Sequence, residues 1–498
     1  MLQDKKYFIR PSVITLCLLI GWTAYPLIFN VQPVYLTTDI LIFVLLVLAL
    51  YLGAYIKKTE YLRRPWQSVF HRRRAVISLV VLIFFLISGL LDSIHMRKPL
   101  EATVNVETQF SVEVTSVLDE LVHTMRTQNE KTYSAPFALH LFSKETVTLD
   151  DGTQIRTFPR LTYAGSHLKN LSNHLSDIIY ITAKGLVYGL VISFGVWLFI
   201  TILVARKSSQ VFYLSWKRVW KADTEIPWRS IYITTAVIIS SITILYFLSE
   251  KYHVLGTDKV GQDVLYLSIK SIRTGLVIGT LTTLIMLPFA ITLGIMAGYY
   301  RGWVDDVIQY TYTVLSSIPG VLLIAAAILS IQVYIANHPE LFETSTDRAD
   351  LRLLALCVIL GITSWSSLCR LLRGETLKLR ELDYVQAATA FGVGHPRILV
   401  RHILPNVLHI ILIIVVLDFS ALVLAEAVLS YVGVGVDPST ISWGNMINGA
   451  RLELAREPMV WWSLVAAFFL MFTLVLSANL FADAVRDAFD PRLQGRSA

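Results

Sequence analysis

Long apolar segments recur along all 498 residues, and they indicate that most of this chain is surrounded by lipid. A helix needs roughly 20 predominantly apolar residues to cross a bilayer, and about ten segments qualify. They are residues 11–30, 38–56, 76–95, 177–204, 229–248, 273–298, 307–335, 352–370, 407–430 and 460–482. Hydrophobic residues make up 55% of the chain, charged residues only 16%, and the mean hydropathy is +0.60. The sequence therefore predicts an all-α polytopic membrane protein with about ten spans.

The basic residues test this topology, because cytoplasmic loops of membrane proteins are enriched in Lys and Arg. The loops after the second, fourth and eighth predicted spans carry clusters that begin at Lys57, Arg206 and Arg370. The first apolar run is long enough to span and has no cleavage pattern after it, so we interpret it as a retained helix. We predict an inner-membrane protein with both termini in the cytoplasm. The net charge of +7 then reflects topology rather than nucleic-acid binding.

A polar segment between the third and fourth predicted spans lies on the outer side. Within it, 103–114 alternates as a strand would, 146–149 and 153–158 flank an Asp-Gly turn, and Leu118 to Met125 shows helical spacing. We predict a small α+β external domain at 96–176. The other predicted parts are an N-terminal extension at 1–95, a fourth span with a basic loop at 177–228, and a six-span core at 229–498.

Just after the fifth predicted span, a segment rich in Gly and Asp reads His253-Val-Leu-Gly-Thr-Asp-Lys-Val-Gly-Gln-Asp. Gly256 and Gly261 allow tight turns, while Asp258 and Asp263 can accept backbone N–H groups of the next helix. Thr257 belongs to the same motif. A capped re-entry turn is the favoured interpretation, and direct contact with a substrate is the alternative.

The long loop after the eighth predicted span contains a short helix at about 383–395. Asp383 and Gln386 are spaced as a capping box, and an apolar face follows at helical spacing. That face comprises Tyr384, Ala387, Ala388 and Phe391. We expect Gly392 to end the helix and Pro405 to interrupt the approach to the ninth span. An ordinary amphipathic helix at the membrane surface is the alternative.

Two carboxylates lie inside the ninth predicted span. An ionisable group there is a functional candidate, because it must face protein or water. Asp418 and Glu426 are eight residues apart, which offsets them by about 80° around a helix. Asp418 either lines a pathway or binds an adjacent span. For Glu426, near the outer end, a structural partner such as a backbone amide is favoured.

These motifs together resemble the C-type membrane subunit of ABC importer permeases of the oligopeptide/dipeptide (peptide/nickel) type. The external motif matches, and Gln386-Ala-Ala, Gly392 and Leu404-Pro405 are similar to the family's Glu-Ala-Ala, Gly, Ile-x-Leu-Pro signature. Gln386 and His402 replace its Glu and Ile. The segments 429–435, 442–446 and 487–493 also match, so the resemblance covers about 250–495.

The resemblance implies that the helix at 383–395 is the coupling helix, which docks into a partner ATPase. It further implies a second related permease, two ABC ATPase subunits or domains that bind ATP and Mg, and a periplasmic solute-binding protein. The expected function is import of dipeptides or oligopeptides by alternating access.

The chain itself has no phosphate-binding loop, so we expect it to be no enzyme and to hold no cofactor or metal. Another solute, such as a nickel complex, an antimicrobial peptide or an oligosaccharide, is the nearest alternative. An ion-coupled secondary transporter is a more distant one, because no convincing inverted repeat is present.

Overall fold

The computed structural model describes residues 31–100, 109–148, 154–208, 212–220, 224–342 and 344–489. Within these ranges, nine helices are long and apolar enough to cross a membrane. Eight of the predicted spans are confirmed by single helices at the predicted places. The predicted span at 11–30 lies outside the described residues.

The predicted span at 307–335 is wrong as a single helix. The segment forms α11 (Gly302–Ser317) and α12 (Gly320–Asn337), and only α12 is long and apolar enough to span. Ile318 between them is extended, with φ −86° and ψ 129°. Pro319 explains the break, because its ring disfavours helical backbone at the preceding residue and it has no N–H to donate.

The contacts divide the chain into two compact units, each built from three stretches of sequence. Unit 1 comprises the described parts of Met1–Gln67, Leu90–Glu120 and Thr280–Leu404. Its elements are β1 (Gln32–Val34), α2 (Thr37–Lys58), most of α3 (Glu60–His71), β2 (His95–Pro99), β3 (Phe110–Ser116), α5 (Val117–Leu121), the second half of α10 (Val264–Tyr300), α11, α12, α13 (Ser345–Arg380), α14 (Asp383–Ala390) and α15 (His395–Ile398). A short 3₁₀ turn (Pro339–Leu341) precedes α13, and a π-helical turn (Leu399–Ile403) follows α15.

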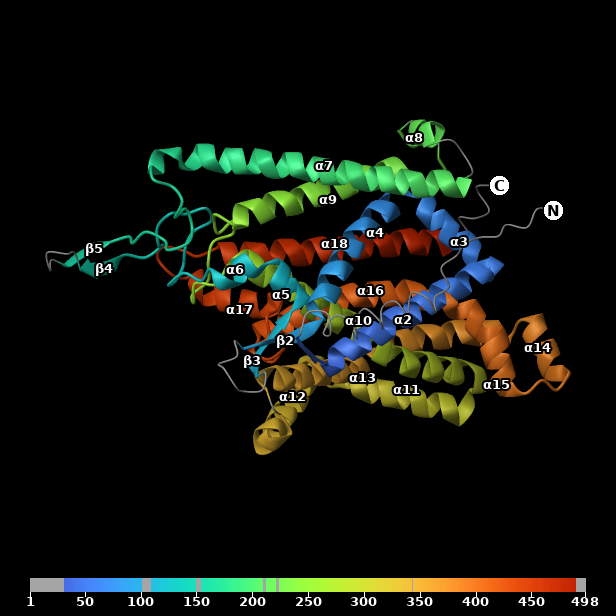
Figure 1. Ribbon diagram of the computed structural model, residues 1–498. Helices are drawn as coiled ribbons and strands as arrows, with labels where there is room; N and C mark the ends of the chain where they lie inside the picture. Colours follow the sequence, from blue (N-terminus) through green and yellow to red (C-terminus); the bar gives the residue numbers. More distant parts are fainter. Residues whose placement is uncertain are drawn as a thin grey trace. The chain divides into compact units, whose positions relative to one another are not determined.

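In unit 1, α13 runs from the small β-sheet at one end to α14 at the other (Figure 1). The sheet has the antiparallel order β1-β2-β3. Near it, the Thr38 hydroxyl at the start of α2 donates a hydrogen bond to Asp350 in the first turns of α13. His95 and the buried Asp39 also form a hydrogen bond, with Nδ1 and Oδ2 2.8 Å apart. These buried polar contacts fix α2 against α13 at the sheet end.

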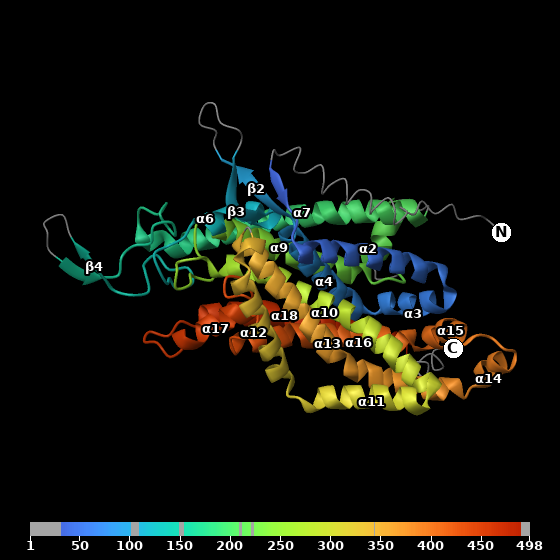
Figure 2. The ribbon, with the colours of Figure 1, turned by 90° about the horizontal axis from the view of Figure 1, so that it is seen from below.

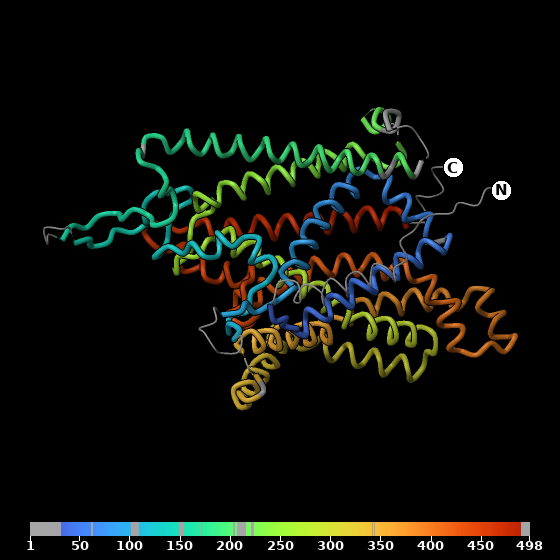
Figure 3. Tube along the Cα trace, in the orientation of Figure 1, coloured from blue at the N-terminus to red at the C-terminus, as the bar shows by residue number. Residues whose placement is uncertain are grey.

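Unit 2 comprises Ser68–Gly89, Leu121–Gly279 and Pro405–Ala498, as far as they are described. Its elements are α4 (Arg73–Asp92), α6 (His123–Thr127), β4 (Glu145–Thr148), β5 (Gln154–Thr157), a 3₁₀ turn (Leu171–Asn173), α7 (His174–Ser208), α8 (Phe212–Trp220), α9 (Trp228–Ser249), the first half of α10, α16 (Leu404–Tyr431), α17 (Trp443–Glu453) and α18 (Trp462–Phe489). Helices α7 and α9 pack along most of their length (Figures 1 and 3). Gly185 and Gly189 make this packing close, since a Cβ on either would lie within 3 Å of the α9 backbone.

The external segment contains the secondary structure expected of it. β4 pairs with β5 in antiparallel register from Glu145↔Thr157 to Thr148↔Gln154, which confirms the predicted hairpin. This hairpin projects away from the helices of unit 2 (Figures 1 and 2). α5 and α6 occupy the predicted helical stretch, and β3 the later part of the first predicted strand. Residues 103–108 and the Asp-Gly turn lie outside the described residues.

The contacts do not follow the predicted domain boundaries. Within the predicted external domain, the described residues up to Glu120 belong to unit 1, and those from Leu121 to 176 belong to unit 2. In unit 2, Met125, Tyr133 and Leu139 share a hydrophobic cluster with the helical residues Trp443 and Trp462. The end of the external segment therefore packs on the helices of unit 2.

Candidate functional sites

The external motif forms a compact loop between α9 and α10. Gly256 and Gly261 have φ values of +71° and +78°, a conformation that favours glycine. The Asp263 carboxylate accepts hydrogen bonds from the backbone N–H groups of Leu265, at 2.8 Å, and Tyr266, at 3.1 Å. Asp263 thus caps α10, as predicted. Asp258 does not cap that helix, because it accepts the N–H groups of the loop residues Val260 and Gln262 instead.

The loop is covered by two stretches of the external segment, 130–137 and 160–165, which we call the clamp. The Ser134 N–H donates to the Thr257 hydroxyl oxygen at 2.7 Å, and the Thr257 hydroxyl donates to the Thr132 carbonyl at 2.9 Å. The Glu130 N–H donates to the Gly261 carbonyl at 2.9 Å. Thr257 is therefore a docking point for the clamp, a role that the sequence did not indicate.

The two motif glycines are also required by the clamp. A Cβ on Gly256 would lie 2.4 Å from the Ser134 carbonyl oxygen, and one on Gly261 would lie 1.7 Å from that of Glu130. Both obstacles are backbone atoms, which cannot rotate away. Tight turns were the predicted reason for these glycines, and close approach of a second backbone is an additional one.

A buried charge network joins the clamp to the motif. His253 Nδ1 lies 2.8 Å from Asp263 Oδ2, and its Nε2 lies 3.8 Å from Glu130 Oε1. Burial alone would lower the pKa of His253, but the two carboxylates raise it to about 9. Burial alone would raise the pKa of Glu130, yet His253 and the N–H groups of Thr162, Tyr163 and Ala164 lower it to about 2. The network therefore holds one cation between two anions at neutral pH.

Aromatic side chains enclose the same loop. The Trp462 indole N–H, at the start of α18, donates to the Thr257 carbonyl at 2.9 Å. The rings of Tyr133 and Phe142 pack edge-on against Trp462. Burial, together with Glu453, raises the pKa of Tyr133. Glu130 and His253 were not predicted as site residues, because a lone acidic residue 123 positions upstream of His253 gives no spacing signal.

The predicted coupling helix is α14, in unit 1. It ends in a Schellman motif, in which the Gly392 N–H donates to the Thr389 carbonyl and the Val393 N–H donates to the Ala388 carbonyl. Gly392 has φ +71°, so its predicted role as the helix terminator is confirmed. The capping box is wrong, because Leu382 is the N-cap and the Gln386 side chain donates to the Glu381 carbonyl.

One face of α14 is buried and the other is open. Val385 is 1% exposed, whereas Tyr384 is 43% exposed and Phe391 87% exposed. Ala387 is exposed and Ala388 half-buried. A large ring almost fully exposed on a short helix is unusual for a face that contacts only water. The predicted apolar face is therefore exposed except at Ala388, which is half-buried.

The flanks of α14 are fixed to the end of α10 in the same unit. Before the helix, Arg301 and Glu381 form an ion pair of 2.5 Å, and Arg380 donates to the Tyr299 carbonyl at 2.7 Å. After the helix, His395 Nδ1 lies 2.8 Å from the Tyr299 hydroxyl. These contacts connect the two flanks of α14 to the end of α10.

Pro405 does not interrupt the approach to α16, contrary to the prediction. The π-helical turn from Leu399 to Ile403 leads straight into α16, whose second residue is Pro405. Pro405 lacks an N–H, and the Leu404 N–H donates to the Leu399 carbonyl five residues back. The wider turn accommodates the proline without a break.

The two carboxylates of α16 have different surroundings. Glu426 is 1% exposed and accepts the Ser430 hydroxyl at 2.8 Å. Ser442 and the N–H of Gly444, at the start of α17, are its other hydrogen-bond partners. This arrangement matches the structural role favoured for Glu426. Asp418 is half-buried, and it makes no hydrogen bond or ion pair to a described residue.

Within the described residues, no group of three His, Cys, Asp or Glu side chains is arranged to hold a metal ion. The tail motif is described as far as Phe489, and its later residues lie outside the described ranges.

The sequence is similar to those of known transport proteins. Residues 290–495 match the family model described as binding-protein-dependent transport system inner membrane component. The chain is 32% identical over 242 residues to the glutathione transport system permease protein GsiD of Pectobacterium atrosepticum, covering 49% of this chain and 73% of that protein. It is 32% identical over 239 residues to the oligopeptide transport system permease protein OppC of Mycobacterium tuberculosis, covering 48% and 76%.

The dipeptide transport system permease protein DppC of Lactococcus lactis is 30% identical over 243 residues, which cover 49% of this chain and 64% of that one. About half of this chain is thus shared with each relative. The chain belongs to the family of binding-protein-dependent transport system inner membrane components, and it is a membrane-embedded permease subunit.

Proposed function

We propose that this chain forms half of the translocation pathway of an ATP-driven importer of dipeptides or oligopeptides. A second related permease forms the other half, and a periplasmic solute-binding protein delivers the substrate. Two ATPase subunits or domains bind ATP and Mg, while this chain hydrolyses nothing. The relatives named for peptide and glutathione transport support this substrate class.

The open face of α14 is the observation that carries the proposal. Phe391, Tyr384 and Ala387 are exposed together, and the ion pair and hydrogen bonds to Arg301 and Tyr299 hold this face rigidly. Docking of the ATPase on this face converts its closure into movement of α10 and α13. Alternating access follows if the two nucleotide states favour different arrangements of the spans.

Asp418 is the pathway residue in this proposal, and Glu426 is structural. An unpaired carboxylate inside a span is costly unless it faces water or a ligand, and a translocation pathway provides both. The external clamp supports the outer end of the same apparatus by fixing the N-terminus of α10 through Asp263.

The test is co-purification from native membranes in mild detergent, with mass spectrometry of the associated proteins. We expect Ala387→Glu combined with Phe391→Glu to lose the ATPase subunits and to retain the second permease, because charges on the open face prevent docking. These positions are exposed, so the substitutions do not disturb the fold. The matched control is Leu452→Glu on α17, since Leu452 is 71% exposed and lies far from α14 in sequence.

Uptake of a labelled dipeptide into vesicles completes the test. We expect uptake to require ATP and to be lost in the double variant. Retention of the ATPase in that variant would disprove α14 as the docking site. Uptake that responds to a proton gradient and not to ATP would favour an ion-coupled transporter instead.

A further inference from the structure

The short helix α8 connects the spans α7 and α9 at the end of unit 2 opposite the clamp. Helix α9 has 22 residues and is therefore roughly 33 Å long, little more than the hydrocarbon core of a bilayer. Its first turns, from Trp228 to Tyr232, thus lie at one membrane boundary. Trp197 of α7 stacks on Tyr232, with ring centroids 5.6 Å apart, and Trp220 of α8 packs edge-on against Trp197 at 5.7 Å. Helix α8 is therefore at the same boundary.

One face of α8 is packed on the spans. Trp216, Val219 and Trp220 follow one another at helical spacing, and Val219 is 1% exposed while the two indoles are half-buried. Trp216 also packs edge-on against Phe194 of α7, with ring centroids 6.2 Å apart. The helix crosses the direction of α7 and α9, and it is the outermost described element of unit 2 on the flank away from α18 (Figures 1 and 3). This orientation is that of a helix lying in the plane of a membrane.

The opposite face of α8 is cationic. Lys217 and Arg218 lie on the other side of the helix from the packed residues and are exposed. Arg206 near the end of α7 and Arg229 at the start of α9 are exposed as well. Along this stretch, Lys or Arg stands at 206, 207, 217, 218, 221 and 229, and Asp or Glu only at 223 and 225. The charge of this face complements an anionic surface.

The flank of α7 next to α8 is apolar. Val191 and Val187 lie on the same helical face as Phe194, about one and two turns further into the span, and are 65% and 60% exposed. Acyl chains fit such a surface, whereas a soluble anion would leave it uncovered. The ligand that matches both surfaces has an anionic head at α8 and an apolar tail along α7.

We propose that α8 lies in the membrane–water interface and binds the headgroups of anionic glycerophospholipids, of the phosphatidylglycerol kind. The indole rings favour this depth, because aromatic side chains with a polar edge concentrate at membrane boundaries. Lys217 and Arg218 attract the lipid phosphates. The bound lipid holds the connection between α7 and α9 against the membrane, since Trp220 packs on Trp197.

The experiment is hydrogen exchange of the backbone at 212–220, measured by mass spectrometry on the full-length chain in nanodiscs. The nanodiscs contain phosphatidylcholine alone or phosphatidylcholine mixed with phosphatidylglycerol. Because a ligand stabilises the folded segment that binds it, we expect phosphatidylglycerol to slow the exchange, by about fivefold for each cation engaged. Lys217→Gln/Arg218→Gln should lose this effect, and Lys217→Arg/Arg218→Lys, which keeps both charges, should retain it.

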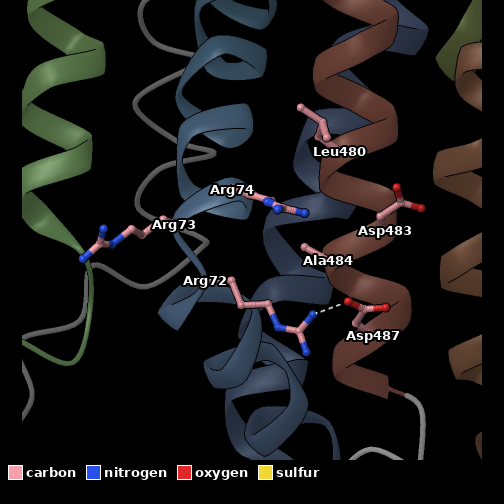
Figure 4. A pocket seen from close by; sticks show the side chains of 7 residues that line it. All are labelled: Arg72, Arg73, Arg74, Leu480, Asp483, Ala484 and Asp487. Carbon is pink, nitrogen blue, oxygen red and sulfur yellow. Dashed lines mark hydrogen bonds and ion pairs between the residues drawn. The ribbon is translucent and has the colours of Figure 1, made fainter.

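The matched control is Arg74→Gln/Arg486→Gln, which removes two exposed cations from the corresponding ends of α4 and α18. Figure 4 shows Arg74 directed from α4 toward α18, where Arg72 and Asp487 form an ion pair. Helix α8 is on the other flank of unit 2, so this variant should keep the full effect of phosphatidylglycerol. An equal loss in the control would show a general surface potential and overturn the proposal.

Three other results would also overturn it. Equal exchange in the two kinds of nanodisc would show that α8 does not respond to anionic lipid. The same protection by inorganic phosphate in phosphatidylcholine nanodiscs would show a site for soluble anions. Loss of co-purifying ATPase subunits from Lys217→Gln/Arg218→Gln, with no lipid effect in the wild type, would show that this face binds protein.

Discussion

Gly261 and Gly392 adopt nearly the same backbone conformation for different physical reasons. Their φ values are +78° and +71°, and a side chain with a Cβ is strained at either position. At Gly392 no atom lies within 4 Å of the place a Cβ would take, whereas at Gly261 the Glu130 carbonyl oxygen lies 1.7 Å from it. The first glycine serves a helix end, and the second serves both a turn and the approach of another segment.

This difference predicts unequal costs of the same substitution. Gly392→Ala should cost about 1 kcal/mol, the strain of a left-handed residue alone. Gly261→Ala should cost several times more, because the clamp must also move. Thermal unfolding of the purified chain measures both, and equal losses would show that the clamp does not contact the motif in solution.

Asp418 and Glu426 give a second contrast at the scale of single residues. Asp418→Asn should reduce peptide uptake with little change in thermal stability, because no described residue depends on its charge. Glu426→Ala should destabilise the chain by about 2 kcal/mol, because it leaves buried hydrogen-bonding groups unpaired. Full uptake by Asp418→Asn would exclude a required charge in the pathway.

Among the elements, the clamp and the loop it covers have a stability that depends on pH. His253 has its pKa raised from 6.5 to about 9, so its contribution to stability is complete below pH 6.5 and is lost as the pH rises through about 9. Glu130 has its pKa lowered from 4.5 to about 2, so its contribution is present above pH 4.5 and is lost as the pH falls toward 2. The clamp should be most stable between pH 4.5 and pH 6.5, where both contributions are complete.

Hydrogen exchange of the backbone at 251–266, corrected for its intrinsic pH dependence, measures this stability. We expect protection to decrease as the pH rises toward 9, and Glu130→Gln to move the decrease to lower pH by removing one of the two anions beside His253. Lys131→Gln is the control, because Lys131 pairs with Glu145 outside the network. Identical profiles for wild type and Glu130→Gln would rule out the network as the cause.

The elements differ in how far the sequence predicts them, because only some of them are determined by local residues. Spans were predictable because hydrophobicity over 20 residues is a local property, and the hairpin because its turn chemistry is local. The continuous apolar run around Pro319 favours one long span, although a proline there signals a helix boundary. The spacing of Asp383 and Gln386 fits a capping box, but the extended Leu382 is the N-cap, so the helix begins at Asp383 and Gln386 lies one position too far along it. The clamp depends on contacts between residues about 125 positions apart, which no local pattern reveals.

At the scale of the molecule, the family-matching half of the chain shares its hydrophobic core with the first half. The hydrophobic cluster of unit 2 combines Phe85 of α4 and Leu168 of the external segment with Trp443 and Trp462. Removal of the first half would expose this cluster. It would also remove the hydrogen-bond partners of backbone groups in the external motif, such as the Gly261 carbonyl. The N-terminal half is therefore part of the folded permease rather than an appendage.

A truncated chain of residues 225–498 tests this conclusion. We expect it to be degraded or aggregated in membranes, and co-expression with residues 1–224 as a separate chain to restore a protease-resistant product. The measurement is limited proteolysis with the full-length chain as the reference. A truncated chain that unfolds at the same temperature as the full-length chain would show that its core is complete.

The β4–β5 hairpin has a practical consequence. Seven of the eight residues of the two strands are exposed, and the strand ends at Thr148 and Gln154 pair with each other. An epitope inserted between these residues would be accessible to an antibody fragment and would not disturb the helices. In intact spheroplasts such a label reports directly which face of the membrane the segment occupies, and in electron microscopy the bound fragment would serve as a fiducial mark for aligning particles of a protein otherwise hidden in its micelle.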